Sequence, residues 1–173
     1  MHGDRELIQI VDAALAEAVR KSGAWLVCRP GCCECCLGPF AITQLDAQRL
    51  RTGLQELETS DPPRATRVHQ RVKAAAAQLP EMGAEGFDVW MEALPEDEAC
   101  PVLDPETGTC DLYSARPVTC RVFGPPIRWG GDAVGVCELC FEGATDDQIA
   151  ACEVQIAIED SEGETIIALA LSD

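Results

Sequence analysis

The sequence predicts a mainly helical α+β fold, in which amphipathic helices surround a cysteine-rich metal-binding centre with one or two short β-hairpins. Three observations support this prediction. Apolar residues recur at three- and four-residue steps in several segments, which is the spacing of one helix face. Short apolar runs in the second half of the chain flank turn-forming residues, as is typical of hairpins. All of the 11 cysteines except Cys152 lie within residues 28–36 and 100–140.

Three helices are expected before residue 80. The first covers residues 4–22, where apolar residues repeat at helical spacing. Thr43 is expected to cap a second helix that continues to Leu57, with a carboxylate near its start. Asp61 followed by Pro62 predicts a cap and a first-turn proline, and this third helix should extend to about Leu79.

The third helix carries an unusually basic face in an otherwise acidic chain. Its basic residues are Arg64, Arg67, Arg71 and Lys73. We expect a solvated helix face here rather than an anion or partner site. The formal net charge of -17 argues against nucleic acid as a partner, because binding to phosphates depends on Lys and Arg. No continuous apolar run approaches about 18 residues, so no membrane span is expected, and the sequence identifies no protein partner.

Two hairpins are expected in the second half of the chain. Apolar residues 101–103 and 109–112 flank a turn-forming segment at 104–108, and this hairpin should bring Cys100 and Cys110 near each other. A second hairpin should join residues 127–129 to 133–136 across Gly130-Gly131-Asp132. It leads directly to Cys137 and Cys140.

Short helices are expected around these hairpins. One lies near residues 87–94, and another is expected to start at a Ser114 cap, with Pro117 early in it and Cys120 facing the first hairpin. A capping box at Thr145–Gln148 should start a helix that carries Cys152 and Ile156. Residues 165–171 form either a final helical turn or a terminal strand, since periodicity alone does not decide between them.

The length predicts one domain, residues 1–173, with metal-binding segments at 28–36 and 100–140 and a helical remainder. The cysteines are expected to be reduced and the protein cytoplasmic, because the N-terminus lacks a secretory pattern and the cysteine count is odd. Pairs as tightly spaced as Cys32 and Cys33 also have poor geometry for a disulfide. A disulfide-built interaction domain is therefore the least favoured hypothesis.

Thiolates that are clustered locally and joined by others on folding are what a metal or iron–sulfur site needs. Cys28, Cys32 and Cys35 form a C-x3-C-x2-C unit that leaves a fourth position for a distant ligand. Adjacent side chains diverge by about 100° in a helix and about 180° in a strand, so Cys35 and Cys36 are expected to serve two sites or one polynuclear cluster. Eight sulfurs would make two four-ligand sites, and their spacing does not separate zinc from an iron–sulfur cluster.

The combined pattern CRPGCCECC, CPVL, CDLYSARPVTCRVFG and a later cysteine resembles the YkgJ family, described as having a zinc- or iron-chelating domain. The resemblance spans residues 28–140. The ligands that it implies are Cys28, Cys32, Cys35, Cys36, Cys100, Cys110, Cys120 and one of Cys137 or Cys140, of which we assign Cys137. Cys33 stands where the family usually has glycine and is expected to be a bystander, and Cys152 is expected to be a small core residue.

The sequence therefore predicts a cytoplasmic protein that binds zinc, an iron–sulfur cluster or both through all-cysteine ligation, in a structural, carrier or electron-transfer role. Tyr113 and Arg116 are expected either to donate hydrogen bonds to bound sulfur or to anchor the Arg-Pro turn. The alternative is a metal- or cluster-dependent enzyme, either an oxidoreductase or a protein related to lysine methylases, because a flagellin lysine methylase carries a similar cysteine domain. No catalytic residue can be singled out among so many carboxylates.

Overall fold

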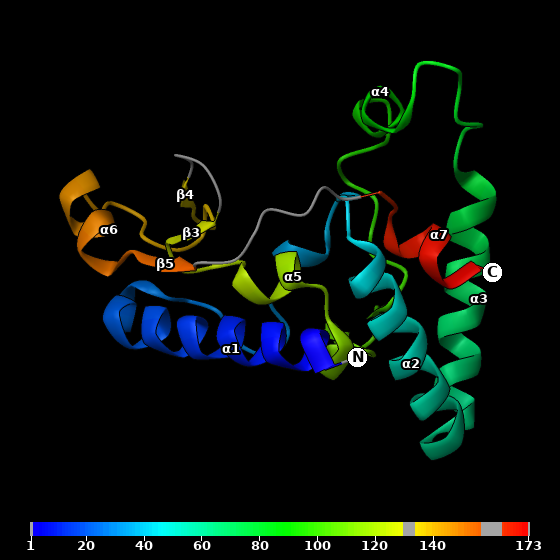
Figure 1. Cartoon of the computed structure of the whole chain (residues 1–173), viewed down its shortest axis with the longest axis horizontal. Helices are drawn as coiled ribbons and strands as arrows, with labels where there is room; N and C mark the ends of the chain where they lie inside the picture. The colour runs from blue at the N-terminus through cyan, green and yellow to red at the C-terminus, as the bar shows by residue number, and fades with distance from the viewer. Residues whose placement is uncertain (1, 130–133, 157–163, 173) are drawn as a thin grey trace. The chain divides into compact units, whose positions relative to one another are not determined.

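The computed structural model describes residues 2–129, 134–156 and 164–172 (Figure 1). They form a mainly helical α+β structure, which confirms the predicted fold class. The chain divides into two compact units, each of which joins segments that are distant in the sequence. Unit 1 comprises Met1–Arg29 and Val118–Ser161, and unit 2 comprises Pro30–Pro117 and Glu162–Asp173. That both units belong to one domain stays a prediction.

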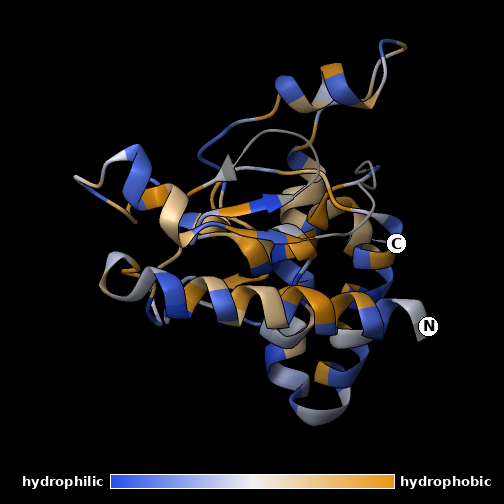
Figure 2. Cartoon of the chain, turned by 60° about the vertical axis from the view of Figure 1, so that its left-hand side comes forward, coloured by the Kyte–Doolittle hydropathy of each residue, from blue (hydrophilic) through white to orange (hydrophobic). Residues whose placement is uncertain are grey.

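Unit 1 combines a long helix with a small mixed sheet. Its elements are α1 (His2–Ser22), the 3-10 turn η1 (Gly23–Trp25), α5 (Val118–Val122), β3 (Ile127–Trp129), β4 (Val134–Gly135), α6 (Asp146–Cys152) and β5 (Val154–Ile156). β3 is the central strand, antiparallel to β4 and parallel to β5. Ala18 of α1 is buried against Ile127, Val154 and Ile156, so the helix packs on the sheet. Figure 2 shows polar and apolar positions alternating along α1.

Several local predictions in unit 1 are confirmed. α1 occupies the expected segment, and no helix in the described part of the chain is long and apolar enough to cross a membrane. Thr145 and Gln148 form the predicted capping box at the start of α6. β3 and β4 pair as predicted, with Ile127 opposite Gly135, whereas the connection through Gly130-Gly131-Asp132 lies outside the described residues.

The prediction that Ile156 belongs to the helix after Thr145 is wrong. α6 ends at Cys152, and the backbone of Glu153 is extended, with ψ of 138°. Residues 154–156 instead form β5, with Val154 opposite Ile127 of β3. β-branched residues favour a half-buried strand, and here a parallel partner far away in the sequence was available.

Unit 2 is built from helices and one hairpin. Its elements are η2 (Glu34–Cys36), α2 (Gln44–Ser60), α3 (Pro62–Gln78), α4 (Phe87–Glu92), β1 (Leu103–Asp104), β2 (Thr109–Cys110), η3 (Tyr113–Ala115) and α7 (Ile167–Ser172). The Thr43 hydroxyl accepts from the Asp46 N–H at the start of α2, and Asp61 accepts from the Arg64 N–H at the start of α3. Both predicted caps are therefore confirmed. Residues 167–172 are helical, which settles the open alternative for the last apolar run.

The core of unit 2 lies between α2, α3 and α7. Side chains from the hairpin and from η3 complete it, and Cys100 and Cys110 pack against it while partly buried. Its buried members are Ile42, Ala47, Leu50, Leu54, Ala65, Val68, Val72, Val102, Leu112, Ala115, Ile167, Ala170 and Leu171. Two of the predicted metal ligands are thus attached directly to the helical core.

The expected helix with a Ser114 cap is also wrong. Ser114 lies inside the 3-10 turn η3, and α5 begins only at Val118. Arg116 separates the two elements, because its backbone is extended, with ψ of 140°. A residue before proline is disfavoured in the helical region, so Pro117 prevents one continuous helix.

Gly53 of α2 faces η3 at a distance that excludes a side chain. A Cβ atom on Gly53 would lie 2.5 Å from Cβ of Ala115. We expect Gly53→Ala to lower the free energy of unfolding by about 1–3 kcal/mol, because overpacking forces backbone shifts. Chemical denaturation checks this. Gly3→Ala in α1 is the control, since a Cβ there meets nothing within 4 Å, and equal stability of the two variants would contradict the close packing of η3 on α2.

Candidate metal centre

All eleven cysteines lie in the described part of the chain and none forms a disulfide there, and the two units divide them. Unit 2 contains Cys32, Cys33, Cys35, Cys36, Cys100 and Cys110. Unit 1 contains Cys28, Cys120, Cys137, Cys140 and Cys152. Five of the eight predicted ligands therefore lie in unit 2, namely Cys32, Cys35, Cys36, Cys100 and Cys110. The other three, Cys28, Cys120 and Cys137, lie in unit 1.

Cys35 and Cys36 lie side by side in the 3-10 turn η2. Their Sγ atoms are 4.0 Å apart, and the turn is closed by the Cys36 N–H, which donates to the Cys33 carbonyl at 2.7 Å. The prediction that these two side chains diverge is wrong. It assumed a regular helix or strand, whereas in this short turn the two side chains converge. The pair can thus contribute two sulfurs to one site.

The segment before Cys100 runs antiparallel to the segment after Cys36. The Cys100 N–H donates to the Cys36 carbonyl at 2.7 Å, Leu37 forms a bridge with Ala99, and the Gly38 N–H donates to Glu98. Cys100 follows Glu98 by two residues. These backbone contacts therefore place the third cysteine beside the first two.

Cys110 joins this group through the predicted hairpin, which is confirmed. Leu103 lies opposite Cys110, three residues after Cys100. The loop before the first cysteines also lies on the hairpin turn, because a Cβ on Gly108 would be 3.2 Å from Cα of Gly31. Both glycines have positive φ, so neither position accepts a side chain without strain.

Backbone N–H groups point at the sulfurs of the hairpin cysteines. Burial raises the pKa of Cys100 to about 12, although the N–H groups of Val102 and Leu103 donate to its sulfur and lower the pKa. Burial also raises the pKa of Cys110, whereas a hydrogen bond from the Leu112 N–H lowers it. Such donors stabilise a thiolate, and bound metal would do so further. The turn after Cys137 in unit 1 repeats this arrangement, with the Leu139 and Cys140 N–H groups directed at the Cys137 sulfur.

One proton is shared unequally within the Cys35 and Cys36 pair. The hydrogen bond from Cys36 lowers the pKa of Cys35 to about 6, and the same contact raises the pKa of Cys36. The positive charge of Arg116 lowers the pKa of both Cys35 and Cys110. Arg116 lies over the ring of Tyr113, with its guanidinium carbon 3.7 Å from the ring centroid. Arg116 Nε also donates to the Tyr113 carbonyl at 3.2 Å, which is a contact of the predicted turn-anchoring role. Hydrogen bonding of this pair to bound sulfur stays a prediction.

Unit 1 contains a second close pair of sulfurs. Cys28 Sγ lies 3.9 Å from Cys140 Sγ, so Cys140 rather than Cys137 meets the first cysteine of the chain. The turn at residues 137–140 is placed by two hydrogen bonds, from the Cys137 N–H to Gly124 and from the Phe141 N–H to Trp25. The C-x2-C spacing of Cys137 and Cys140 was the available sequence signal for this partner.

That Cys32 and Cys120 bind metal stays a prediction. Cys32 and Cys33 are half-buried in unit 2, and Cys120 lies in α5. Cys152 is buried, and its sulfur donates to the Lys21 carbonyl. Within residues 2–129, 134–156 and 164–172, no three Cys, His, Asp or Glu side chains lie close enough together to form a ready metal site.

An apolar cavity of about 120 Å³ adjoins Cys100 in unit 2. Phe40, Leu79, Leu94 and Ile167 contribute to its walls. Apolar surroundings disfavour a charged thiolate, which agrees with the raised pKa of Cys100.

In the reduced, metal-free chain we expect iodoacetamide to alkylate Cys35 at least about 10-fold faster than Cys100 at neutral pH, because the thiolate is the nucleophile. The pKa of Cys35 is about 6 and that of Cys100 about 12, so at neutral pH the Cys35 thiol is ionised and the Cys100 thiol is not. Its alkylation rate should fall as the pH drops through about 6. Peptide mass mapping after brief labelling measures both rates, and equal labelling would contradict the geometry of η2.

Gly124 leaves room for the Cys28 sulfur. Its φ is +124°, and a Cβ there would lie 3.2 Å from Cys28 Sγ. We expect Gly124→Ala to lower the free energy of unfolding by about 1–3 kcal/mol, because the backbone would be strained and the new Cβ would crowd the Cys28 sulfur. Gly135→Ala in β4 of the same unit is the control, since a Cβ there meets nothing within 4 Å. Chemical denaturation of both variants checks this, and a stable Gly124→Ala protein would argue against the close approach of Cys28.

Comparison with protein families gives one match that spans both cysteine-rich segments. The matching family model covers residues 27–141 and is described as "CxxCxxCC: Putative zinc- or iron-chelating domain". Comparison with curated proteins found no matching relative, and comparison with solved structures found no matching structure. The match supports metal binding and confirms the resemblance to a family defined by clustered cysteines. The chain belongs to the CxxCxxCC family of zinc- or iron-chelating domains.

Proposed function

We propose that the chain binds one zinc or iron ion through the thiolates of Cys35, Cys36, Cys100 and Cys110 in unit 2. The observation that carries this proposal is that backbone pairing gathers these four cysteines from two distant segments. Each of the four thiols affects the pKa of another member of the set, which places them within electrostatic reach. For ligation, the four side chains would have to rotate towards one point.

The spacing of the sulfurs favours a single ion over a cluster. In a tetrahedral site with Zn–S bonds of about 2.3 Å, neighbouring sulfurs lie about 3.8 Å apart. The distance between the Cys35 and Cys36 sulfurs, 4.0 Å, is close to this value. In a four-iron cluster each thiolate binds a different iron, which sets the ligand sulfurs further apart. Cys28 and Cys140, at 3.9 Å, have the same spacing and could begin a second site in unit 1 together with Cys137.

The surroundings of the four thiols suit a thiolate site. Four thiolates and one divalent ion carry a net charge of about -2. Arg116 offsets part of this charge, and the N–H groups of Val102, Leu103 and Leu112 donate to the sulfurs. Hydrogen bonds from such outer groups orient the ligands and tune the metal.

The ligand count favours a structural, carrier or electron-transfer role over catalysis. Four protein sulfurs close a tetrahedral site, whereas catalytic zinc keeps one position open for water or substrate. An enzymatic role would require one of the four thiols to leave the metal. Free thiolates also call for a reducing compartment, so we propose that the protein acts in the cytoplasm.

Elemental analysis of the protein, purified without oxygen, tests the proposal. We expect bound zinc or iron in the wild-type chain and a loss of at least about 10-fold in metal affinity in Cys100→Ser and Cys110→Ser, because each removes one thiolate ligand. Cys33→Ser is the matched control from the same segment and should keep its metal.

Acid-labile sulfide separates a mononuclear ion from a cluster, because only the cluster contains it. A wild-type chain without bound metal would contradict metal binding itself. Full metal content in both Cys100→Ser and Cys110→Ser would instead contradict the choice of ligands.

A further inference from the structure

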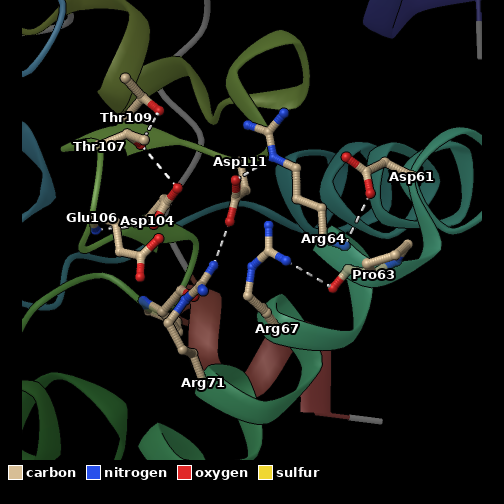
Figure 3. Close-up of polar contacts among 11 residues, drawn as sticks. Asp61, Pro63, Arg64, Arg67, Arg71, Asp104, Glu106, Thr107, Thr109 and Asp111 are labelled. Carbon is tan, nitrogen blue, oxygen red and sulfur yellow. Dashed lines mark hydrogen bonds and ion pairs between the residues drawn. The ribbon is translucent and has the colours of Figure 1, made fainter.

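We infer that Asp111, Arg64 and Arg71 form a positioning network that fixes the two hairpin cysteines of the metal centre relative to α3. The inference rests on the proposed function, because it concerns the same four thiols. It assigns a role to part of the basic face of α3, which was expected to be solvated. Arg64 and Arg71 instead point at one buried carboxylate of the hairpin (Figure 3).

Asp111 follows Cys110 directly and is almost completely enclosed. Its side chain is 1% exposed, and its N–H donates to the Val102 carbonyl at 2.8 Å. One carboxylate oxygen accepts from Arg64 Nε and the other from Arg71 Nη2. A buried carboxylate needs such partners, and two charge-assisted hydrogen bonds fix its orientation. The backbone of Cys110 is therefore tied to α3 through its neighbour.

Arg71 contacts both cysteine segments with one side chain. Besides binding Asp111, its Nε donates to the Pro101 carbonyl at 3.0 Å. Pro101 follows Cys100, just as Asp111 follows Cys110. A planar guanidinium has donors in a fixed geometry, so it sets the separation of the two acceptors that it binds. Arg71 thus spaces the residues next to two proposed ligands.

α3 provides a rigid base for this network. Val68 lies four residues after Arg64 and Val72 directly follows Arg71, and both valines are buried in the core of unit 2. The helix is therefore held by its apolar side while Arg64 and Arg71 reach the hairpin. Metal ligands need support of this kind, because a thiolate displaced by a small distance cannot complete the coordination shell.

Arg67 offers an internal control. It lies between Arg64 and Arg71 on the same helix, but its hydrogen bond goes to the Pro63 carbonyl of α3 itself (Figure 3). Replacing Arg67 by Gln removes the same charge as replacing Arg71 by Gln. A difference in metal affinity between these two variants therefore results from the loss of the Arg71 contacts to Asp111 and Pro101, because both variants lose one positive charge.

Titration of the reduced full-length chain with Co²⁺, a zinc substitute with a visible spectrum, tests the network. We expect Arg71→Gln and Asp111→Asn to bind Co²⁺ about 10- to 100-fold more weakly than the wild type, the usual effect of losing a residue that supports a ligand. Arg67→Gln should bind like the wild type. Arg71→Lys keeps the charge but cannot span both acceptors, so its affinity should fall as well.

The Co²⁺ spectrum separates positioning from general stability. In Arg71→Lys that is folded by circular dichroism, we expect a weaker sulfur-to-cobalt charge-transfer band at saturating metal, because fewer thiolates reach the ion. A band equal to that of the wild type, together with unchanged affinity in Arg71→Lys and Arg71→Gln, would overturn the inference and leave the proposed function intact. A wild-type chain that binds no Co²⁺ would overturn both.

Discussion

The burial of one hairpin against the helices of unit 2 is the constraint on which the candidate metal centre depends. Val102 and Leu112 lie two residues after Cys100 and Cys110, and both are buried in the core with α2, α3 and α7. The N–H groups of these same two residues donate to the sulfurs of the preceding cysteines. Hydrophobic burial has no direction of its own. In this hairpin, however, burial of the Val102 and Leu112 side chains fixes the orientation of their N–H groups, which point at the cysteine sulfurs.

This arrangement also creates an electrostatic problem that metal would relieve. Burial raises the pKa of Cys100 to about 12, so without a cation the thiol stays protonated at neutral pH. The hydrogen bond from Cys36 and the charge of Arg116 lower the pKa of Cys35, and the Leu112 N–H and Arg116 act against the effect of burial on the pKa of Cys110. A divalent ion deprotonates its thiol ligands and supplies the missing positive charge. The backbone of the candidate site is therefore already ordered, whereas its thiols are costly to ionise without a metal ion, so metal binding is coupled to their deprotonation.

Local features were predictable from the sequence, and long-range ones were not. The caps at Thr43 and Asp61 and the first hairpin follow from a few neighbouring residues, and all are present. The convergence of Cys35 and Cys36 was not predicted, because it depends on a 3-10 turn that no periodicity reveals. β5 was not predicted either, because its parallel partner β3 is distant in the sequence. Ile127 of β3 pairs with Val154, which lies 27 residues later. Sequence patterns identified the metal-binding residue type, but pairing within each unit decides which cysteines meet.

The segment from Cys110 to Arg116 shows how one short stretch can serve both scaffold and chemistry. Asp111 ties it to α3, Leu112 anchors it in the core, and the ring of Tyr113 supports the Arg116 guanidinium near the thiols. Each of these contacts depends on its distance from the cysteine, since an insertion would move the side chains that follow it to different faces of the turn. The spacing between Cys110, Tyr113 and Arg116 is therefore a geometric requirement. A cysteine on a flexible loop would also supply a sulfur. That sulfur would have no fixed orientation and no positively charged side chain held beside it.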